Sequence, residues 1–537
     1  MKVSSRFLRS SDGNVAIFAA LLAVPLLIGA GLAMDYATVS RVNHELQGAL
    51  DTAALAVARE GKAMTDDRAR QVVAQFVSAN FNGTVDGVTV NRSAYSVKVS
   101  ATVTPALAFS GLLGNNIWQV TNDSTAEYAP AKFEIALALD QTGSMAGAKL
   151  AAMKDAVNTM VEAMSLQVTD PAALKIGVVP YATFVNVGPQ YGPSFDKKGK
   201  VDKKTGADWL DIEGKVKTDQ IELPDNLSRF EVYEALGRKW PGCVETRMPT
   251  KKGEYDVMDI EATSKDKDSL FVPTFSIDEP DDTWPDGFPK YPNNYITSLL
   301  PAVADTLSKK ELKLAKYGLQ KVAGVYVLDP LRSVMMDETN SIFYSNEADP
   351  KGPGFGCEVE PLLPLTSNVA AIKAKVNAIK ANGSTNITEG VMWAWRVLSD
   401  RAPFQEASAK SKGARKILIL LTDGTNSYGN LDNELKSGYS STGYLVDERL
   451  DGTDVGSTVG ETTAAMNAKT LAACTNAKAD GIEIYTIRLE EPNVTTGTLL
   501  QECASGADHY FDSPSKEQLT PIFDKIRDML TVVRLAS

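Results

Sequence analysis

Residues 134–144 read EIALALDQTGS, an apolar run that ends in an aspartate and is followed by hydroxyl side chains and a glycine. Strands that are buried on both faces are continuous apolar runs of this kind, whereas half-buried strands alternate. The run therefore predicts a strand inside a parallel sheet, with Asp140 at its carboxyl end. Thr142 and Ser144 follow in the turn, where Gly143 permits a tight backbone.

Three further apolar runs repeat this pattern towards the C-terminus, and segments with a helical spacing of apolar residues lie between them. The runs are 176–179, 417–421 and 482–487, and the predicted helices are 149–164, 368–381, 462–479 and 516–530. Buried strands that alternate with helices are typical of a parallel sheet covered on both faces. We therefore predict a doubly wound α/β domain over residues 131–537.

A long segment, residues 182–361, interrupts this alternation. It is rich in proline, aspartate, lysine and tryptophan and contains two of the cysteines. A stretch of this length is too long for one loop. We therefore predict a large insertion in the α/β domain, stiffened by Cys243 and Cys357.

The chain contains four cysteines and no Cys-x-x-Cys pair, which argues against the usual zinc-knuckle and thioredoxin spacings. An even number is compatible with two disulfides in an oxidising compartment, and composition alone leaves four buried thiols as an equal alternative. Cys474 and Cys503 flank the predicted strand 482–487, and the other two cysteines bracket the insertion. Among three possible connectivities we predict the pairs 474–503 and 243–357.

The N-terminal part contains an uncharged apolar run at 15–34, which as a helix spans about 30 Å, the thickness of a bilayer core. Lys2, Arg6 and Arg9 precede it, so the positive-inside rule places the N-terminus in the cytoplasm and the rest outside. A cleaved signal peptide is the alternative, because residues 31–33 have the small-x-small form of a cleavage site. We favour a single-pass anchor, since the helical spacing continues past the run without a break.

Between the apolar run and residue 130 the sequence predicts two helices and a small sheet. The helices show apolar residues at helical spacing, and the middle strand alternates strictly between apolar and polar residues. The predicted helices are 34–59 and 66–79, and the predicted strands are 88–91, 95–104 and 118–127. We therefore predict a small pilin-like α+β domain over residues 35–130, preceded by a cytoplasmic tip and transmembrane helix over residues 1–34.

The composition excludes several classes of function. The net charge is −12 and no basic stripe occurs, so we expect no nucleic-acid binding, which needs clustered positive charge. The two histidines are His44 and His509, too few for a histidine-rich zinc centre, and a Ser-His-Asp triad would have to use one of them. An acidic surface is compatible with divalent cations.

Three polar clusters lie at the ends of predicted elements: 140–144, 383–386 and 422–424. Because ligands of open α/β sheets bind at the carboxyl ends of the strands, we expect Asp140 and Asp423 on one rim. Two carboxylates and several hydroxyls suit a hard cation, Mg²⁺ or else Mn²⁺ or Ca²⁺. The alternative is three separate helix caps.

Taken in order, the three clusters resemble the metal-ion-dependent adhesion site of von Willebrand factor A domains. That site has an Asp-x-Ser/Thr-x-Ser stretch, a threonine in a second loop and an aspartate in a third. The resemblance assigns five metal-binding residues, Asp140, Thr142, Ser144, Thr385 and Asp423. It implies that they hold the metal directly or through water, and that one coordination position is left for an acidic group of a partner.

The chain as a whole is similar to TadG-like Flp pilus-assembly proteins. The stretches that carry this resemblance are GNVAIFA at 13–19, LQGALDTAAL at 46–55, WPGCVE at 240–245, NNY at 293–295 and LQECAS at 500–505. The resemblance implies a component of the tight-adherence pilus machine, anchored in the inner membrane with its bulk in the periplasm. Its A domain would bind a protein partner of the pilus or secretion apparatus.

Two other functions use the same residues. A surface adhesin would bind an external ligand with an acidic group directly through the metal. An enzyme of the haloacid-dehalogenase type would use Asp140 as an aspartyl nucleophile, but it needs a second aspartate two residues later as general acid, and Thr142 stands there. We therefore predict a binding protein and not an enzyme.

Overall fold

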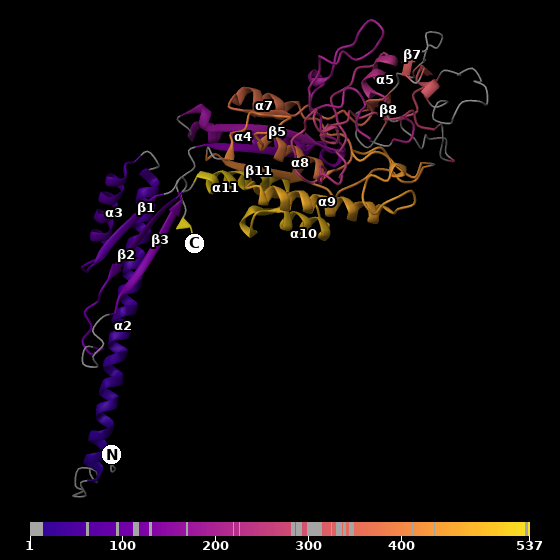
Figure 1. The fold of residues 1–537 in the computed structure, drawn as a ribbon. Helices are drawn as coiled ribbons and strands as arrows, with labels where there is room; N and C mark the ends of the chain where they lie inside the picture. Colours follow the sequence, from indigo (N-terminus) through magenta and orange to yellow (C-terminus); the bar gives the residue numbers. More distant parts are fainter. Residues whose placement is uncertain are drawn as a thin grey trace. The chain divides into compact units, whose positions relative to one another are not determined.

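The structure of the protein is a computed structural model, and Figure 1 labels its elements. It describes residues 14–60, 64–92, 96–110, 118–127, 132–167, 170–217, 220–224, 226–280, 285, 293–297, 314–323, 325–328, 336, 340–342, 348–410, 413–433, 435–531 and 535–536. Contacts between Cα atoms divide the chain into two compact units, Met1–Pro130 with Met529–Ser537, and Ala131–Asp528. Lys2, Arg6 and Arg9, on which the predicted topology rests, lie outside the described residues.

The first unit contains one long helix, α2 (Asn14–Glu60), which continues through Pro25. Large apolar side chains between Phe18 and Met34 are exposed on it. Among the described residues, this is the one helix that is long and apolar enough to cross a membrane, with a mean hydropathy of 2.0 over its most apolar stretch. A signal sequence near the N-terminus would pass the same test. The predicted continuity of the helix past the apolar run is confirmed.

Beyond Leu46, α2 packs against α3 (Asp66–Asn80) and a small antiparallel sheet through a shared apolar core. The strands of the sheet, in spatial order, are β1 (Gly87–Arg92), β2 (Ser96–Val103), β3 (Val120–Glu127) and β14 (Leu535–Ala536). The predicted alternating strand is confirmed as β2, although Tyr95, its first predicted residue, lies outside the described residues. Strand β14 lies in the range 131–537, which the sequence analysis assigned to the α/β domain, but its two residues pair with β3. The strand was not predicted, because two residues are too few to show a periodic pattern.

The second unit is built on a six-stranded sheet. Its strands, in spatial order, are β10 (Leu363–Thr366), β5 (Leu174–Tyr181), β4 (Phe133–Asp140), β11 (Arg415–Thr422), β12 (Glu483–Leu489) and β13 (Tyr510–Ser513). The four predicted runs form β4, β5, β11 and β12, and these strands pair in parallel. The sheet is not wholly parallel, since β10 runs antiparallel to β5 at one edge.

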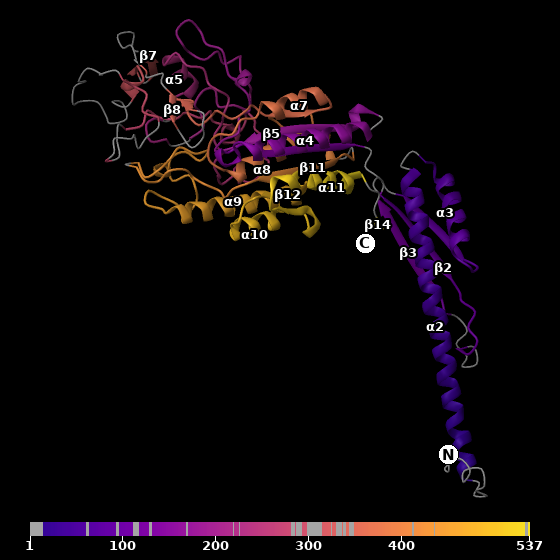
Figure 2. The same ribbon diagram turned by 180° about the vertical axis from the view of Figure 1, so that it is seen from behind.

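Helices cover both faces of this sheet. Helix α8 packs on the face that holds Ala136 and Ala138 (Figure 1), and every residue of α8 is buried. Because side chains alternate along a strand, Leu137 points to the opposite face, which α4 covers (Figure 2). The helices are α4 (Ala148–Gln167), α7 (Val369–Ala378), α8 (Ile387–Leu398), α9 (Val459–Ala479), α10 (Val494–Cys503) and α11 (Leu519–Thr531).

The described parts of the predicted insertion belong to the same core as the sheet. Phe230 and Phe271 lie in one apolar cluster with Trp393 of α8. The short elements of the insertion are α5 (Arg229–Ala235), β6 (Leu319–Val322), β7 (Val325–Leu328), β8 (Asn340–Ile342) and β9 (Ala348–Pro350). The insertion is therefore an integral part of the second unit.

The structure joins the four cysteines in two disulfides. Cys243 pairs with Cys357 and Cys474 with Cys503, at Cα–Cα distances of 5.8 and 5.1 Å. The predicted pairing is confirmed.

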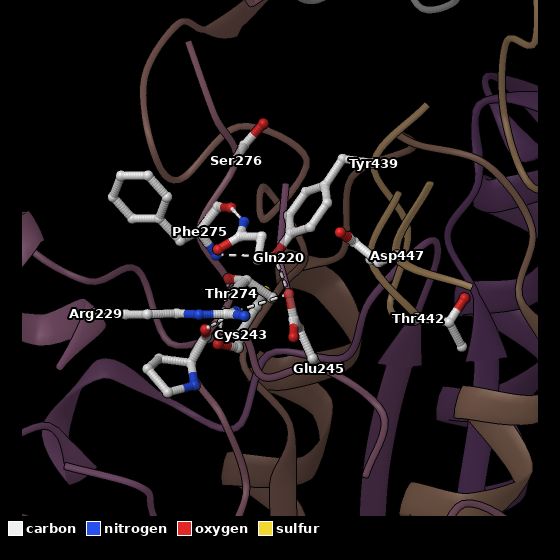
Figure 3. A network of polar contacts seen from close by, with 12 residues as sticks. Gln220, Arg229, Cys243, Glu245, Thr274, Phe275, Ser276, Tyr439, Thr442 and Asp447 are labelled. Atoms are coloured by element: carbon white, nitrogen blue, oxygen red, sulfur yellow. Dashed lines mark hydrogen bonds and ion pairs between the residues drawn. The ribbon is translucent and has the colours of Figure 1, made fainter. Parts of the chain in front are cut away.

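A buried group of charges links the insertion to the segment that follows β11. Glu245 accepts hydrogen bonds from Arg229 of α5 and from Arg449, each at 2.7 Å, and from the Tyr439 hydroxyl at 2.6 Å. Figure 3 shows Arg229 and Tyr439 directed at the Glu245 carboxylate. Burial raises the pKa of Glu245, but the two guanidinium groups outweigh it and lower the pKa overall. Glu245 is therefore held as a carboxylate.

Candidate metal site

The carboxyl ends of β4 and β11 lie side by side, because the two strands are parallel neighbours in the sheet. Strand β4 ends in Asp140, and β11 ends in Thr422, directly before Asp423. Asp140 is 0% exposed and Asp423 is 4% exposed. Two carboxylates are thus buried at one rim of the sheet.

Asp140 is held by the backbone and by the neighbouring strand. Its Oδ1 accepts the N–H of Thr142 at 2.8 Å, and its Oδ2 accepts the hydroxyl of Thr422 at 2.7 Å. Burial, and then the negative charge of Asp423, raise the pKa of Asp140 to about 6, although these hydrogen bonds act in the opposite direction. The site therefore carries more negative charge than its buried surroundings favour.

The hydroxyl groups of the first loop connect the two carboxylates. The Ser144 hydroxyl donates to Asp423 Oδ1 at 2.6 Å, and Thr142 Oγ1 lies 3.0 Å from Ser144 Oγ. Asp140, Thr142, Ser144 and Asp423 consequently form one continuous group of oxygen atoms.

Thr385, in the loop between α7 and α8, lies beside the same group. Its carbonyl oxygen accepts the N–H of Ser427 at 2.9 Å, which ties this loop to the segment after β11. A Cβ atom placed on Gly424 would lie 3.2 Å from Thr385 Oγ1 and 3.8 Å from Ser144 Oγ. The structure thus brings all five predicted residues together, and a glycine at 424 leaves room for the hydroxyls.

Lys149 is a member of the site that the sequence analysis missed. It lies in the first turn of α4, and its Nζ donates to Asp423 Oδ2 at 2.7 Å. The sequence analysis treated it only as the start of a helix, because nothing in the local pattern indicates that its side chain reaches Asp423. Among the described residues, no group of three or more histidines, cysteines, aspartates or glutamates is arranged so that it could hold a metal ion. The site therefore consists of two carboxylates, three hydroxyls and one lysine.

Replacing Lys149 by methionine is expected to increase the affinity for Mg²⁺ about tenfold, equivalent to about 1.4 kcal/mol. The Lys149 ammonium group binds an oxygen of Asp423 and would repel a Mg²⁺ ion at the same carboxylate. Removing the ammonium group should therefore strengthen Mg²⁺ binding. Calorimetric titration of Mg²⁺ into the full chain in detergent measures the effect. Lys154→Met is the control, because Lys154 lies on the same helix and its ammonium donates to the carbonyl of Asn377, away from the site. Equal affinities in the two variants would contradict the expectation.

Comparison with known proteins gives one family match, in the N-terminal segment. The model described as putative Flp pilus-assembly TadE/G-like matches residues 13–60. No curated protein matches the chain.

Solved structures give distant matches. The pilus adhesin SpaC from Lactobacillus rhamnosus GG is 11% identical, with a TM-score of 0.32, and the match covers 83% of this chain and 33% of that one. The von Willebrand factor domain of the pilus tip protein Mfa5 from Porphyromonas gingivalis is 9% identical, with a TM-score of 0.31, over 75% and 95% of the two chains. A von Willebrand factor type A protein from Catenulispora acidiphila is 12% identical, with a TM-score of 0.27, over 83% and 49%. This chain thus spans about a third of the SpaC structure.

Proposed function

We propose that this chain is a membrane-anchored component of a Tad/Flp pilus machine that binds a protein partner through a divalent metal. In this proposal the second unit is a von Willebrand factor A domain. The observation that carries it is the gathering of Asp140, Ser144 and Asp423, from two neighbouring strand ends, into one buried group of oxygens. The proposed metal-binding residues are Asp140, Thr142, Ser144, Thr385 and Asp423.

The chemistry of these donors fits a hard cation. They offer carboxylate and hydroxyl oxygens and no sulfur or imidazole, a set that suits Mg²⁺, or else Mn²⁺ or Ca²⁺, better than zinc. A divalent ion would neutralise the two buried carboxylates, whose mutual repulsion contributes to the raised pKa of Asp140. When bound, the ion would supply a positive centre that attracts a carboxylate of the partner. Binding, and not catalysis, is the proposed activity.

The anchor and the compartment follow from the N-terminal segment. Residues 13–60 match the TadE/G-like family, and α2 within them has the length and composition to cross a membrane once. We propose the inner membrane as the location, with the bulk of the chain in the periplasm. The two disulfides support an oxidising compartment.

Crosslinking in cells tests this function. The wild-type chain is expected to crosslink to a component of the pilus apparatus, and Asp140→Ala is expected to lose that product. Asp155→Ala is the matched control, because Asp155 is an exposed carboxylate on α4, the helix that follows the site. Unchanged crosslinking in Asp140→Ala would refute the proposal. Capture of only an external matrix protein would favour the adhesin instead.

A further inference from the structure

One buried aspartate connects α2 to the segment that follows β2. Asp35 is 6% exposed, and its carboxylate accepts three backbone N–H groups, from Ala108 at 3.0 Å, Phe109 at 3.0 Å and Ser110 at 2.6 Å. Burial raises the pKa of Asp35, but these donors outweigh it and lower the pKa overall. Charge-assisted hydrogen bonds of this kind are strong. The segment is therefore fastened to the helix directly after its apolar run.

The ring of Phe109 lies against the apolar run itself. A Cβ atom placed on Gly31 would be 2.6 Å from Phe109 Cγ, so the missing side chain of Gly31 makes room for the ring. Gly31 precedes Asp35 by four residues, which places the ring about 6 Å nearer to the N-terminal end of the helix. Phe109 nevertheless remains 37% exposed. An aromatic side chain thus lies beside the predicted membrane-spanning segment with part of its surface free.

Trp118 lies at a similar level along α2. Two hydrogen bonds show that strand β3 runs beside the helix in the same direction. The Asn122 side chain donates to the carbonyl of Asn43, and the Gln47 side chain donates to the carbonyl of Asp123. Trp118 precedes Asn122 by four residues, or about 13 Å of extended chain. In a helix the same length corresponds to about nine residues. Counted back from Asn43, which lies beside Asn122, it brings Trp118 to about the level of Met34. Its side chain is 43% exposed.

We propose that Phe109 and Trp118 insert into the interfacial region of the same lipid bilayer that α2 crosses. The first unit would then contact the membrane through the helix and through these two side chains, and Asp35 would hold Phe109 to the helix. The proposal rests on the proposed anchor, because a chain cleaved before Met34 would lack Gly31.

Continuity with the exposed apolar surface of α2 identifies the lipid as the occupant. Leu26, Leu27 and Met34 are 71, 70 and 64% exposed on the helix, on both sides of Gly31, beside which Phe109 lies. The sequence between Lys98 and Asp123 contains no charged residue. Tryptophan favours the boundary between headgroups and hydrocarbon, and aromatic rings in general combine an apolar body with polarisable faces.

Spin labelling of the full chain in phosphatidylcholine–phosphatidylglycerol vesicles tests the proposal. All four cysteines are in disulfides, so Phe109→Cys or Trp118→Cys introduces a single free thiol for the label. Collisions with oxygen, which concentrates in lipid, are compared with collisions with a water-soluble nickel chelate. We expect the ratio of the two to be several-fold higher at both positions than at Phe76→Cys. Phe76 is the matched control, being also 37% exposed but on α3, which packs on α2 beyond Leu46.

Each other outcome overturns the proposal. A ratio equal to that at Phe76 would place both side chains in water. Protection of both labels from both reagents would show a protein contact in place of lipid. A measured mass that corresponds to a chain starting near Met34 would show that the anchor has been cleaved off. The metal titration concerns the second unit, so its result would not change in that case. Asp35→Ala, combined with Phe109→Cys, should increase the mobility of the label and lower the ratio, which identifies Asp35 as the fastening.

Discussion

Replacing Glu245 by leucine is expected to lower the free energy of unfolding of the second unit by about 3–5 kcal/mol, the usual cost of leaving buried charges without their partner. Arg229 and Arg449 are 5 and 6% exposed, and both donate to Glu245. Without the carboxylate, the two guanidinium groups and the Tyr439 hydroxyl would stay buried and would lose their hydrogen bonds to it. Figure 3 shows two of these three groups, Arg229 and Tyr439. Chemical denaturation of the full chain, followed by its aromatic near-ultraviolet signal, measures the loss.

Glu517→Leu provides the control for this experiment. Glu517 pairs with Lys516 at 2.9 Å, but its side chain is 67% exposed, so its replacement should leave the free energy of unfolding almost unchanged. Similar losses in the two variants would show that the buried group contributes no more than a surface ion pair does.

Asp140→Ala is expected to remove the stabilisation of the protein by Mg²⁺ entirely. Mass action predicts that the wild type gains about 2.7 kcal/mol when the ion is present at a hundred times its dissociation constant. The variant should gain nothing, because it lacks one of the two carboxylates, and it should keep its fold, because Asp140 lies at the rim of the sheet. Thermal unfolding with and without Mg²⁺ measures both effects, and Asp155→Ala should behave as the wild type. A gain of the same size in Asp140→Ala would contradict the assignment.

The pH dependence of this gain has a defined direction. The raised pKa of Asp140, about 6, means that the folded metal-free protein binds a proton more tightly than the unfolded chain does. The stability contributed by that proton is full below the ordinary aspartate pKa near 4 and is lost as the pH rises through about 6. Mg²⁺ competes with the proton, so the gain from Mg²⁺ should be full at pH 7 and above and should shrink as the pH falls below about 6.

The sheet and its rim could be predicted because burial leaves a local trace in the sequence. The runs that form β4, β5, β11 and β12 are apolar throughout, and each lies at the expected place. The four-residue β10 and the two-residue β14 were missed, since short strands at an edge contain too few residues for a recognisable period. Parallel strands bring their carboxyl ends together, which is why Asp140 and Asp423 could be assigned to one rim. Thr385 lies between two helices, and only the resemblance to the adhesion site assigned it there.

Side-chain contacts between distant segments could not be predicted in this way. Lys149 and Asp423 are 274 positions apart, and Glu245 and Arg449 are 204 apart. Nothing in the local pattern around either residue indicates its partner, because the pairing depends on how separate loops pack. In the sequence, Asp35 is simply the charged residue that follows the apolar run. Its hydrogen bonds to the segment after β2 depend on how that segment packs against α2.

Calorimetric titration of Mg²⁺ into the full chain tests the central claim most directly. We expect one saturable site in the wild type, weaker binding in Thr385→Ala, where a water can replace one hydroxyl, and no binding in Asp140→Ala. Absence of binding by the wild type at millimolar Mg²⁺, or equal binding by Asp140→Ala, would contradict it and would leave the three loops as separate helix caps and turns.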